Sequence, residues 1–547
     1  MTPGLPPDRQ VEASEPGGAV HRNAAPEATP MSTLPATPLR NLLARLPRGE
    51  TLLVLVGLVL LAGIVFLTQN RVVGFEPGYN ELQPKHHGWV SSHTLAIIRH
   101  ATWSNAFVGY AESIVSTDGQ RDFDYFDRYP VFFSVAMNGL LSLKTRLSTQ
   151  IYLAKQAMNL IFLMTLVMAF LLVRKLTGQT LAAAAIAVVS MSSPYLLFYK
   201  DMVHYDQPAL LGMMLLLYAI ALFKIDGRRR IVYPAVLISV GLGRGYASLA
   251  VLGTWLILET LPLIRQRTGR WSRFIRLTAL RALILGVLWA GLCLSYNIAV
   301  ESIRREVPPL QTSIVQSARN RLALNEEFNQ SYLRILDWQT FLSDQTIRVV
   351  RWSFPVWEYE GSVALSTLIL AGLFGVIILQ ARRLDPDRRL ILLLMALSGP
   401  VWLIGMRNLS AFHDYTAMYY LGIPLAFYTA LVARLRWPGA VWLALALLSL
   451  AVFTYRNDQI QALHDRIGHP FDSYTHDFMR IAEALPGPHP LIDLEDGVPF
   501  APYALGFYLP DAFQAPESLA DDVISKDKHW SADNLTPANS HLFLFCR

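Results

Sequence analysis

Long apolar blocks separated by short polar connections dominate the chain between residues 50 and 455. An α-helix needs about 17 to 25 such residues to cross a hydrocarbon core of about 30 Å. Lipid offers the backbone no other hydrogen-bond partners, so helices must do the spanning. The pattern predicts an all-α polytopic membrane protein with about eleven transmembrane helices, at residues 51–67, 150–173, 180–199, 207–223, 230–243, 246–264, 278–299, 363–381, 388–406, 414–433 and 437–455.

The segments outside these blocks divide the chain further. Residues 1–38 are rich in Pro, Ala, Gly and Thr and predict a disordered tail before a transmembrane domain at 39–455. Long extramembrane loops are expected at 68–149 and 300–362, and residues 456–547 predict a small α/β domain, with a helix at 474–484 and strands at 489–493 and 541–545. The first block is longer than a signal peptide requires and lacks a small-residue cleavage site, which favours a retained anchor.

Two shorter elements are expected in the first long loop. Val90 to Trp103 places Val90, Thr94, Ile97 and Ala101 on one side, which predicts an amphipathic helix on the membrane surface. The apolar segment 130–143 has only 14 residues, which fits a re-entrant or interfacial helix better than a span.

Composition and charge agree with a membrane protein. Hydrophobic residues make up 53% and charged residues only 16% of the 547 residues, against roughly 25% charged in soluble domains. Twenty Lys and Arg residues lie at one set of helix ends, and four short-loop cations (Lys200, Arg244, Arg407 and Arg456) lie at the other. The positive-inside rule then predicts a cytosolic N-terminus and a periplasmic C-terminus in a bacterial inner membrane. This topology explains the net charge of +6 without a nucleic-acid partner. Two cysteines argue against a disulfide framework and against a thiolate metal site.

The first outer loop holds several residues capable of chemistry. Glu76, Glu81, His86 and His87 precede the expected surface helix, and Asp127 and Arg128 precede the short apolar segment. Adjacent histidines do not have the spacing of a helical metal site. A divalent metal that joins one of them to an acid elsewhere stays an alternative, and solvated loop histidines are the simpler interpretation.

The second outer loop is short and contains Asp201, His204 and Asp206. Asp206 precedes a span and is either a helix N-cap or a site residue. Ionisable groups at membrane depth usually serve a pathway or a site, and three of them within six residues favour the second interpretation.

Four further candidates fall on the same predicted face: Arg244, Arg407, His413 and Asp414. Either arginine, taken alone, fits a side chain that extends to the interface. The glycines around Arg244 do not follow a strand, so they do not form a dinucleotide-binding loop.

Three stretches of this layout resemble the GT-C superfamily of membrane glycosyltransferases, and most closely family 39, the protein O-mannosyltransferase and aminoarabinose-transferase branch. They are Phe126–Phe133 (FDRYPVFF), the segment from Ser192 to Asp206 that ends in an acid before a span, and Phe412–Pro424 (FHDYTAMYYLGIP). The likeness covers roughly residues 50–455. The family places an acidic pair before its first surface helix, where this chain has His86-His87-Gly88.

The resemblance implies transfer of a sugar from a polyprenyl-phosphate donor to a lipid, glycan or protein acceptor, with inversion at the anomeric carbon. Such a reaction needs a base near the acceptor, for which Asp206, Glu76, Glu81, His86 and His87 are the candidates. The leaving phosphate needs cations such as Arg128, Arg244 and Arg407. Asp127, Asp201, His204, His413 and Asp414 complete the expected substrate-binding set, and no metal ligand or cofactor is assigned.

Three other functions fit a polytopic protein. A transporter would carry ionisable residues near the bilayer midplane and repeated halves, whereas here the polar residues lie at helix ends. A polysaccharide ligase or polymerase would place its main outer loop late in the chain. A non-catalytic scaffold would follow if the His86 departure marked a lost activity.

Overall fold

The computed structural model describes residues 86–103, 109–112, 123–126, 132–144, 146–242, 246–266, 337–353, 362–471, 491–494, 513–514 and 544–546, with the single residues Gly49, Gly57, Arg319 and Leu324. The chain divides into two units, Met1–Leu52 and Leu53–Arg547, and every element described below belongs to the second. The predicted tail 1–38 and the predicted spans 51–67 and 278–299 lie outside the description, apart from Gly57.

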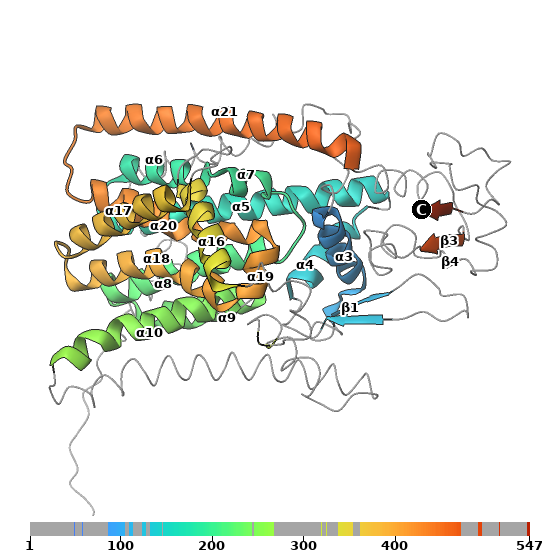
Figure 1. Ribbon diagram of the computed structural model, residues 1–547, viewed down its shortest axis with the longest axis horizontal. Coiled ribbons are helices and arrows are strands. Elements are labelled where there is room, and N and C mark those ends of the chain that lie inside the picture. Colours follow the sequence, from blue (N-terminus) through green and yellow to red (C-terminus); the bar gives the residue numbers. More distant parts are fainter. Residues whose placement is uncertain are drawn as a thin grey trace, which may run out of the picture. The chain divides into compact units, whose positions relative to one another are not determined.

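Helices make up nearly all of the described chain (Figure 1). In order they are α3 (His86–His100), α4 (Phe132–Leu141), α5 (Leu147–Thr177), α6 (Thr180–Met191), α7 (Pro194–Phe198), α8 (Asp206–Asp226), η2 (Arg229–Ile231), α9 (Val232–Gly241), α10 (Tyr246–Gln266), α16 (Trp338–Ser353), α17 (Val363–Ala381), α18 (Pro386–Gly405), α19 (Arg407–Phe412), η5 (Asp414–Leu421), α20 (Gly422–Val432) and α21 (Gly439–Phe471). Here η marks a 3₁₀-helix.

Six of the described helical segments are long and apolar enough to cross a membrane: 149–177, 206–226, 363–381, 386–405, 414–432 and 439–459. These correspond to six of the predicted spans. The predicted spans 180–199, 230–243 and 246–264 also fall on helices, but the first is divided between α6 and α7 and the second is only the ten residues of α9 plus the short η2. The protein is therefore a multi-pass membrane protein.

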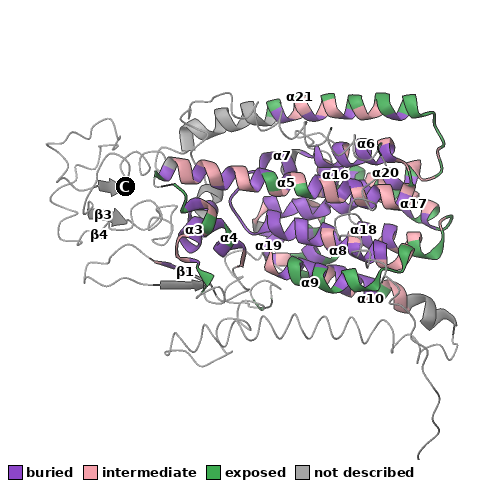
Figure 2. Ribbon diagram, turned by 180° about the vertical axis from the view of Figure 1, so that it is seen from behind, coloured by how far each residue is buried: buried purple, intermediate pink, exposed green. Residues whose placement is uncertain are grey.

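The centre of the bundle is α8, together with η5 and α20. In the most apolar 18-residue stretch of each span, the buried share is 72% in α8 and 78% in 414–432. It is only 17% in both α17 and α21. Figure 2 shows the same division, with buried residues along α8, α18 and α20 and exposed residues along α21. A helix that is apolar on all sides belongs in the middle of a membrane bundle, because its neighbours cover every face.

Two glycines allow α18 to approach η5 and α20 closely. A Cβ atom added to Gly399 would come 2.0 Å from the carbonyl oxygen of Tyr419, and one added to Gly422 would come 2.0 Å from that of Met395. Small residues at helix interfaces let backbones come together in this way in membranes. The two contacts hold η5 and the start of α20 against α18.

Ion pairs link helices at the end of the bundle opposite Asp206. Lys175 of α5 pairs with Asp226 of α8, and Lys224 of α8 pairs with Glu259 of α10. These groups belong to the basic helix ends that the sequence analysis assigns to the cytosol.

Helix α3 begins at His86, four residues before the expected start at Val90, and ends at His100. The apolar spacing does not mark this first turn, because a first turn can form from residues that add nothing to the apolar side of the helix. The four residues expected on one side are buried, but so are Ser91, Ser92, Leu95, Ala96 and Ile98. The helix is therefore covered on more than one face.

The short apolar segment forms α4, as predicted, with ten residues or about 15 Å of helix. The Nδ2 group of Asn138 in α4 donates to the carbonyl of Ala101 at 2.8 Å, which ties α4 to the end of α3. An antiparallel hairpin of β1 (Gly109–Glu112) and β2 (Phe123–Phe126) follows α3, and His100 stacks on Tyr110 at 5.0 Å.

In the C-terminal region, α21 continues to Phe471, beyond the expected end of the last span at 455. Strands β3 (Leu491–Leu494), β4 (Phe513–Gln514) and β5 (Leu544–Cys546) form a parallel sheet in the order β4-β3-β5. Strands β3 and β5 overlap the two predicted strands. The predicted helix at 474–484 lies outside the described residues.

Candidate active site

Asp206 is the first residue of α8 and is fully buried. The N-cap position belongs to Tyr205, whose side chain makes no capping hydrogen bond. The interpretation of Asp206 as an N-cap is therefore wrong. Its carboxylate instead contacts a side chain of the preceding loop and one from a distant part of the chain.

Two contacts hold the Asp206 carboxylate. The hydroxyl of Tyr419, in η5, donates to Oδ1 at 2.8 Å, and Nδ1 of His204 lies 2.6 Å from Oδ2. The N-terminal end of α8 adds the partial positive charge of its backbone dipoles. The hydrogen bond from Tyr419 and the helix end offset part of the cost of burying a carboxyl group.

A second acid, Asp414, lies at the start of η5. Its Oδ2 atom accepts a hydrogen bond of 2.7 Å from the Tyr199 hydroxyl, and its Oδ1 atom accepts one of 2.9 Å from the backbone N–H of Tyr415. The second outer loop and the late polar segment are thus joined twice, through Asp206 and through Asp414.

The Tyr415 ring lies between two histidines. His413 stacks on it at 5.1 Å between ring centroids, and His204 meets it edge-on at 5.5 Å. Tyr199 also approaches it edge-on at 6.0 Å. The predicted residues His204, Asp206, His413 and Asp414 therefore lie in one cluster built around this ring.

Helix α4 contributes to the same cluster through Tyr205. The hydroxyls of Ser134 and Tyr205 are 2.8 Å apart, and the Phe133 ring meets that of Tyr205 at 5.8 Å. The three stretches that carry the family resemblance are far apart in sequence, and the structure brings described residues of all three together.

Lys200 and Asp201, between α7 and α8, are both buried. The ammonium group of Lys200 donates to the Leu197 carbonyl at 3.2 Å. Burial lowers the pKa of Lys200 from its usual value of 10.5 to about 8, and the charges of Asp201 and Asp458 oppose that shift.

Arg407 begins α19, with its guanidinium carbon 4.2 Å from the centre of the Trp338 ring. Loss of water around it lowers its pKa from the usual value, and Asp337 opposes this effect. A guanidinium stacked on an aromatic ring still presents its N–H groups to an anion, so Arg407 remains suited to a phosphate.

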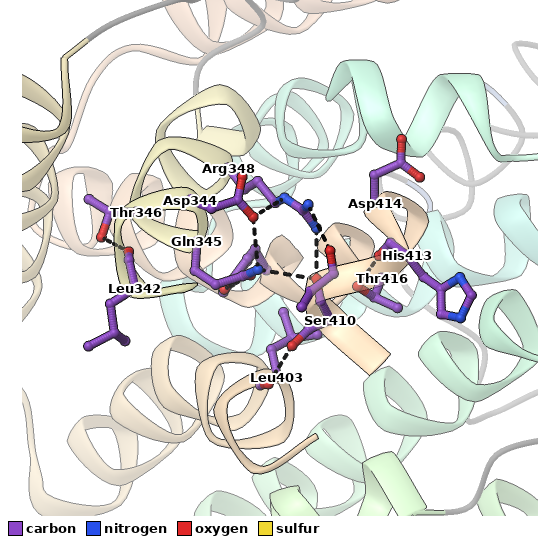
Figure 3. A network of polar contacts seen from close by, with 12 residues as sticks. Leu342, Asp344, Gln345, Thr346, Arg348, Leu403, Ser410, His413, Asp414 and Thr416 are labelled. Carbon is purple, nitrogen blue, oxygen red and sulfur yellow. Dashed lines mark hydrogen bonds and ion pairs between the residues drawn. The ribbon is translucent and has the colours of Figure 1, made fainter. Parts of the chain in front are cut away.

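A network anchored by Arg348 of α16 holds the chain just before His413 (Figure 3). Arg348 donates to the carbonyls of Ser410 at 2.8 Å and Ala411 at 3.4 Å, and its Nε atom pairs with Asp344 at 2.8 Å. Gln345 also donates to the Ser410 carbonyl, at 3.2 Å. The network positions the end of α19, from which His413 and Asp414 continue.

The remaining predicted site residues do not belong to this cluster as the structure describes it. His86 and His87 are the first two residues of α3, not loop residues as expected. The remaining candidates lie outside the described residues: Glu76, Glu81, Asp127, Arg128 and Arg244. Within the part of the chain that the structure describes, no group of three or more His, Cys, Asp or Glu residues has an arrangement that could hold a metal ion.

Sequence reasoning did not identify Tyr199, Tyr415 and Tyr419, which contact the two acids, or Gln345 and Arg348, which hold the chain at Ser410. One available indication was the density of tyrosines in Asp414–Leu421, because a buried tyrosine hydroxyl usually requires a hydrogen-bond partner.

Comparison with known proteins gives a structural match and no sequence match. No protein-family model and no curated protein matches the chain. The crystal structure of ArnT from Cupriavidus metallidurans bound to undecaprenyl phosphate superposes with a TM-score of 0.54, at 14% identity over 85% of this chain and 86% of ArnT. The Archaeoglobus fulgidus oligosaccharyltransferase tethered to an acceptor peptide gives a TM-score of 0.49, at 11% identity over 86% of this chain and 64% of that protein.

The match to ArnT extends over most of both chains. In this chain α3, the short apolar α4 and then α8, which begins at Asp206, follow one another in the order that the resemblance implies. The chain has the fold of the GT-C membrane glycosyltransferases.

Proposed function

We propose that this protein transfers a sugar from a polyprenyl-phosphate donor to an acceptor hydroxyl at the periplasmic face of a bacterial inner membrane. The observation that carries the proposal is the buried Asp206 carboxylate, held by His204 and Tyr419 at the N-terminal end of the central helix α8. It occurs in a fold shared with ArnT, whose structure contains undecaprenyl phosphate.

The chemistry of such a transfer matches the cluster. Attack of an acceptor hydroxyl on the anomeric carbon needs a group to take its proton. Departure of the lipid phosphate needs a cation, and Arg407 is a described arginine at the same end of α18 and η5 as the acids. Arg128 and Arg244 are the further cations that the sequence predicts, and inversion at the anomeric carbon is the expected outcome.

The position of the acids favours a transferase over a transporter. A transporter places its ionisable groups near the middle of the membrane. Asp206 is the first residue of its span and Asp414 is the first residue of the other central span, 414–432. A site at helix ends suits a donor whose lipid tail stays in the bilayer while its sugar phosphate lies at the surface. The charge distribution at the helix ends supports the periplasmic side.

The test is transfer by the purified full-length protein in nanodiscs. Undecaprenyl-phosphate sugars with labelled hexoses and pentoses are supplied with extracted envelope lipids, glycans and proteins, and label in the acceptor fraction is measured. We expect transfer by the wild type and loss of at least about 100-fold in Asp206→Asn. Asp387→Asn, an exposed acid in the first turn of α18, is the matched control and should transfer normally.

Binding and abundance complete the test. Undecaprenyl phosphate should raise the melting temperature of the wild type and of Asp206→Asn alike, since ligand binding stabilises the folded state. Transfer at the wild-type rate by Asp206→Asn would contradict the site. Wild-type protein that transfers none of the labelled sugars would contradict the function.

A further inference from the structure

Trp338 is exposed in a helix that buries its other large aromatic side chains. Its side chain is 51% exposed, whereas Phe341 and Trp352, also in α16, are each 1% exposed. The three residues around it in the first turn are polar and exposed: Asp337, Gln339 and Thr340. Leu342, one turn further on, is the nearest exposed apolar residue at 46%. The indole ring therefore begins the helix in mainly polar surroundings.

Two neighbours hold the indole ring in one orientation. The guanidinium carbon of Arg407 lies over one face, 4.2 Å from the ring centre, and the Phe341 ring meets it edge-on at 6.0 Å and 81°. These contacts cover one face and one edge, and the exposed half of the side chain leaves the opposite face open. A ring that is already oriented loses little conformational freedom when a ligand stacks on it.

Arg407 has hydrogen-bonding capacity that the described residues do not use. Its Nε atom is buried and has no hydrogen-bond partner among them. The side chain as a whole is only half-buried, so its terminal amino groups are the part that reaches solvent. Asp337, the acid whose charge acts on this guanidinium, accepts hydrogen bonds from the backbone N–H groups of Gln339 and Thr340. The terminal amino groups are therefore available to a ligand.

Helix α16 runs alongside η5 and α20 in the same direction. The Tyr420 hydroxyl donates to Gln345 at 2.7 Å, and the Tyr428 hydroxyl donates to the Ser353 carbonyl at 3.4 Å. The partners are 75 positions apart in both cases, so the two bonds define one register between the elements.

The same register extends to the pair. Seven positions earlier on each element, it places Trp338 at the level of His413. Arg407 begins α19, six residues before His413, and Arg348 of α16 holds the Ser410 carbonyl between them. The pair therefore lies next to the residues of the candidate active site.

We propose that Trp338 and Arg407 form a subsite that binds a sugar ring beside His413 and Asp414. The C–H face of the sugar stacks on the open face of the indole, and its hydroxyl or phosphate oxygens accept hydrogen bonds from the terminal amino groups of Arg407. The inference deepens the proposed function and rests on it for the source of the sugar, which is the polyprenyl-phosphate donor or an acceptor glycan.

The chemistry of the pair favours a sugar over other ligands. A lipid tail would use the indole but not the guanidinium, and a bare phosphate would use the guanidinium but not the indole. A sugar has an apolar C–H face and a rim of oxygens, so it uses both at once. Binding sites for such ligands usually combine aromatic walls with a few fixed polar groups.

Direct binding is measured first, by saturation-transfer difference NMR on the full-length protein in nanodiscs. The probes are glucose, mannose, galactose and arabinose, their 1-phosphates, and methyl phosphate as a probe without a ring. We expect saturation of the ring protons of at least one sugar, and a signal at least about fivefold weaker in Trp338→Ala. Trp338→Phe should keep part of the signal. Trp437→Ala is the matched control, because Trp437 is 45% exposed and stacks on Trp442 in another part of the bundle. It should bind like the wild type.

The nanodisc transfer assay then identifies the source of the sugar. Trp338→Ala should raise KM by at least about fivefold with kcat within about twofold of the wild type, because the stack holds the ring without touching the reacting atoms. A higher KM for the donor alone assigns the ring to the donor, and a higher KM for the acceptor alone assigns it to the acceptor glycan. Arg407→Lys keeps the charge but not the planar fork of N–H groups, and it should raise the same KM.

The opposite outcomes are equally defined. No sugar signal from the wild type, or an unchanged sugar signal in Trp338→Ala, would overturn the subsite. A lower melting temperature for Trp338→Ala, with both KM values unchanged, would show that this face lies in lipid with Leu342, and it would overturn the subsite while leaving the transferase standing. A wild type that binds sugars through Trp338 but transfers none would overturn the proposed function and leave the subsite standing.

Discussion

The Tyr419 hydroxyl donates a 2.8 Å hydrogen bond to Asp206 Oδ1, between residues 213 positions apart in the chain. Both side chains are fully buried. The bond connects the two central spans at the ends where they begin, so it contributes both to packing and to the orientation of the acid.

Tyr419→Phe should therefore lower both stability and activity. The lost bond to a buried acid should cost about 1 to 3 kcal/mol of unfolding free energy and lower the melting temperature by several degrees. Sugar transfer should fall because Asp206 loses one of its two described partners. Tyr420→Phe removes a buried 2.7 Å bond to Gln345 and is the matched control. It should lower stability comparably and change transfer much less, and equal losses of transfer would contradict the role of Tyr419.

Gly399→Ala should displace η5. The new methyl group would come 2.0 Å from the carbonyl oxygen of Tyr419, so backbone must move rather than a flexible side chain. Overpacking of this kind usually costs about 1 to 3 kcal/mol. A thermal melt should show the loss, and transfer should fall with it. Gly375→Ala in α17 has nothing within 4 Å of the added atom and should be neutral or stabilising.

Arg348→Met should loosen the end of α19. The arginine holds two backbone carbonyls and Asp344 while only 14% of its side chain is exposed. Its removal takes the described donor from the Ala411 carbonyl and leaves the Ser410 carbonyl with Gln345 alone. We expect a melting temperature several degrees lower and faster proteolysis near residue 411. Arg388→Met breaks an exposed pair with Asp385 and should have little effect. If the two variants melted alike, the Arg348 network would not stabilise this region.

Lys200 predicts a specific dependence on pH. Its pKa is about 8 in the folded protein against 10.5 for an ordinary lysine, so the unfolded chain binds more protons between these values. Stability should therefore rise as pH increases from about 8 to 10.5, and the full cost of burying the charge applies below pH 8.

Lys200→Met tests this dependence. The variant should melt higher than the wild type at pH 7, and the difference should shrink as pH rises above 8. Lys144→Met replaces an exposed lysine and should show no such trend. A difference between Lys200→Met and the wild type that stays constant from pH 7 to pH 10 would contradict the assignment.

The transmembrane layout could be predicted because apolar length and flanking charge act locally. Two predictions of helix bounds failed. The span expected at 180–199 is interrupted near Ser192–Ser193, just before Pro194, because the residue before a proline disfavours helical backbone. Apolar length alone did not take this local signal into account. The start of α3 was missed because no apolar spacing marks its first turn.

The candidate site could be predicted only as a list of ionisable residues. His204, Asp206, His413 and Asp414 do lie together, and the restricted length of the second loop made the first pair easy to group. Their partners could not be predicted, because Tyr199 meets Asp414 across 215 residues. A tyrosine within an apolar block is otherwise indistinguishable from a packing residue until the fold places its hydroxyl. The orientation of the helices in the membrane stays a prediction from the charge count.

The eight residues of η5 have a consequence for how the two central spans are coupled. A 3₁₀-helix turns about 120° per residue and an α-helix about 100°. Asp414 and Tyr419 are five residues apart on η5 and bond to Tyr199 and Asp206 respectively. Rewinding η5 as an α-helix would rotate one of these side chains about 100° relative to the other, so both bonds can form together only at the tighter pitch. The two tyrosine–aspartate bonds together therefore favour the 3₁₀ winding of η5. If either bond is broken, the backbone between Asp414 and Tyr419 can rewind without breaking the other.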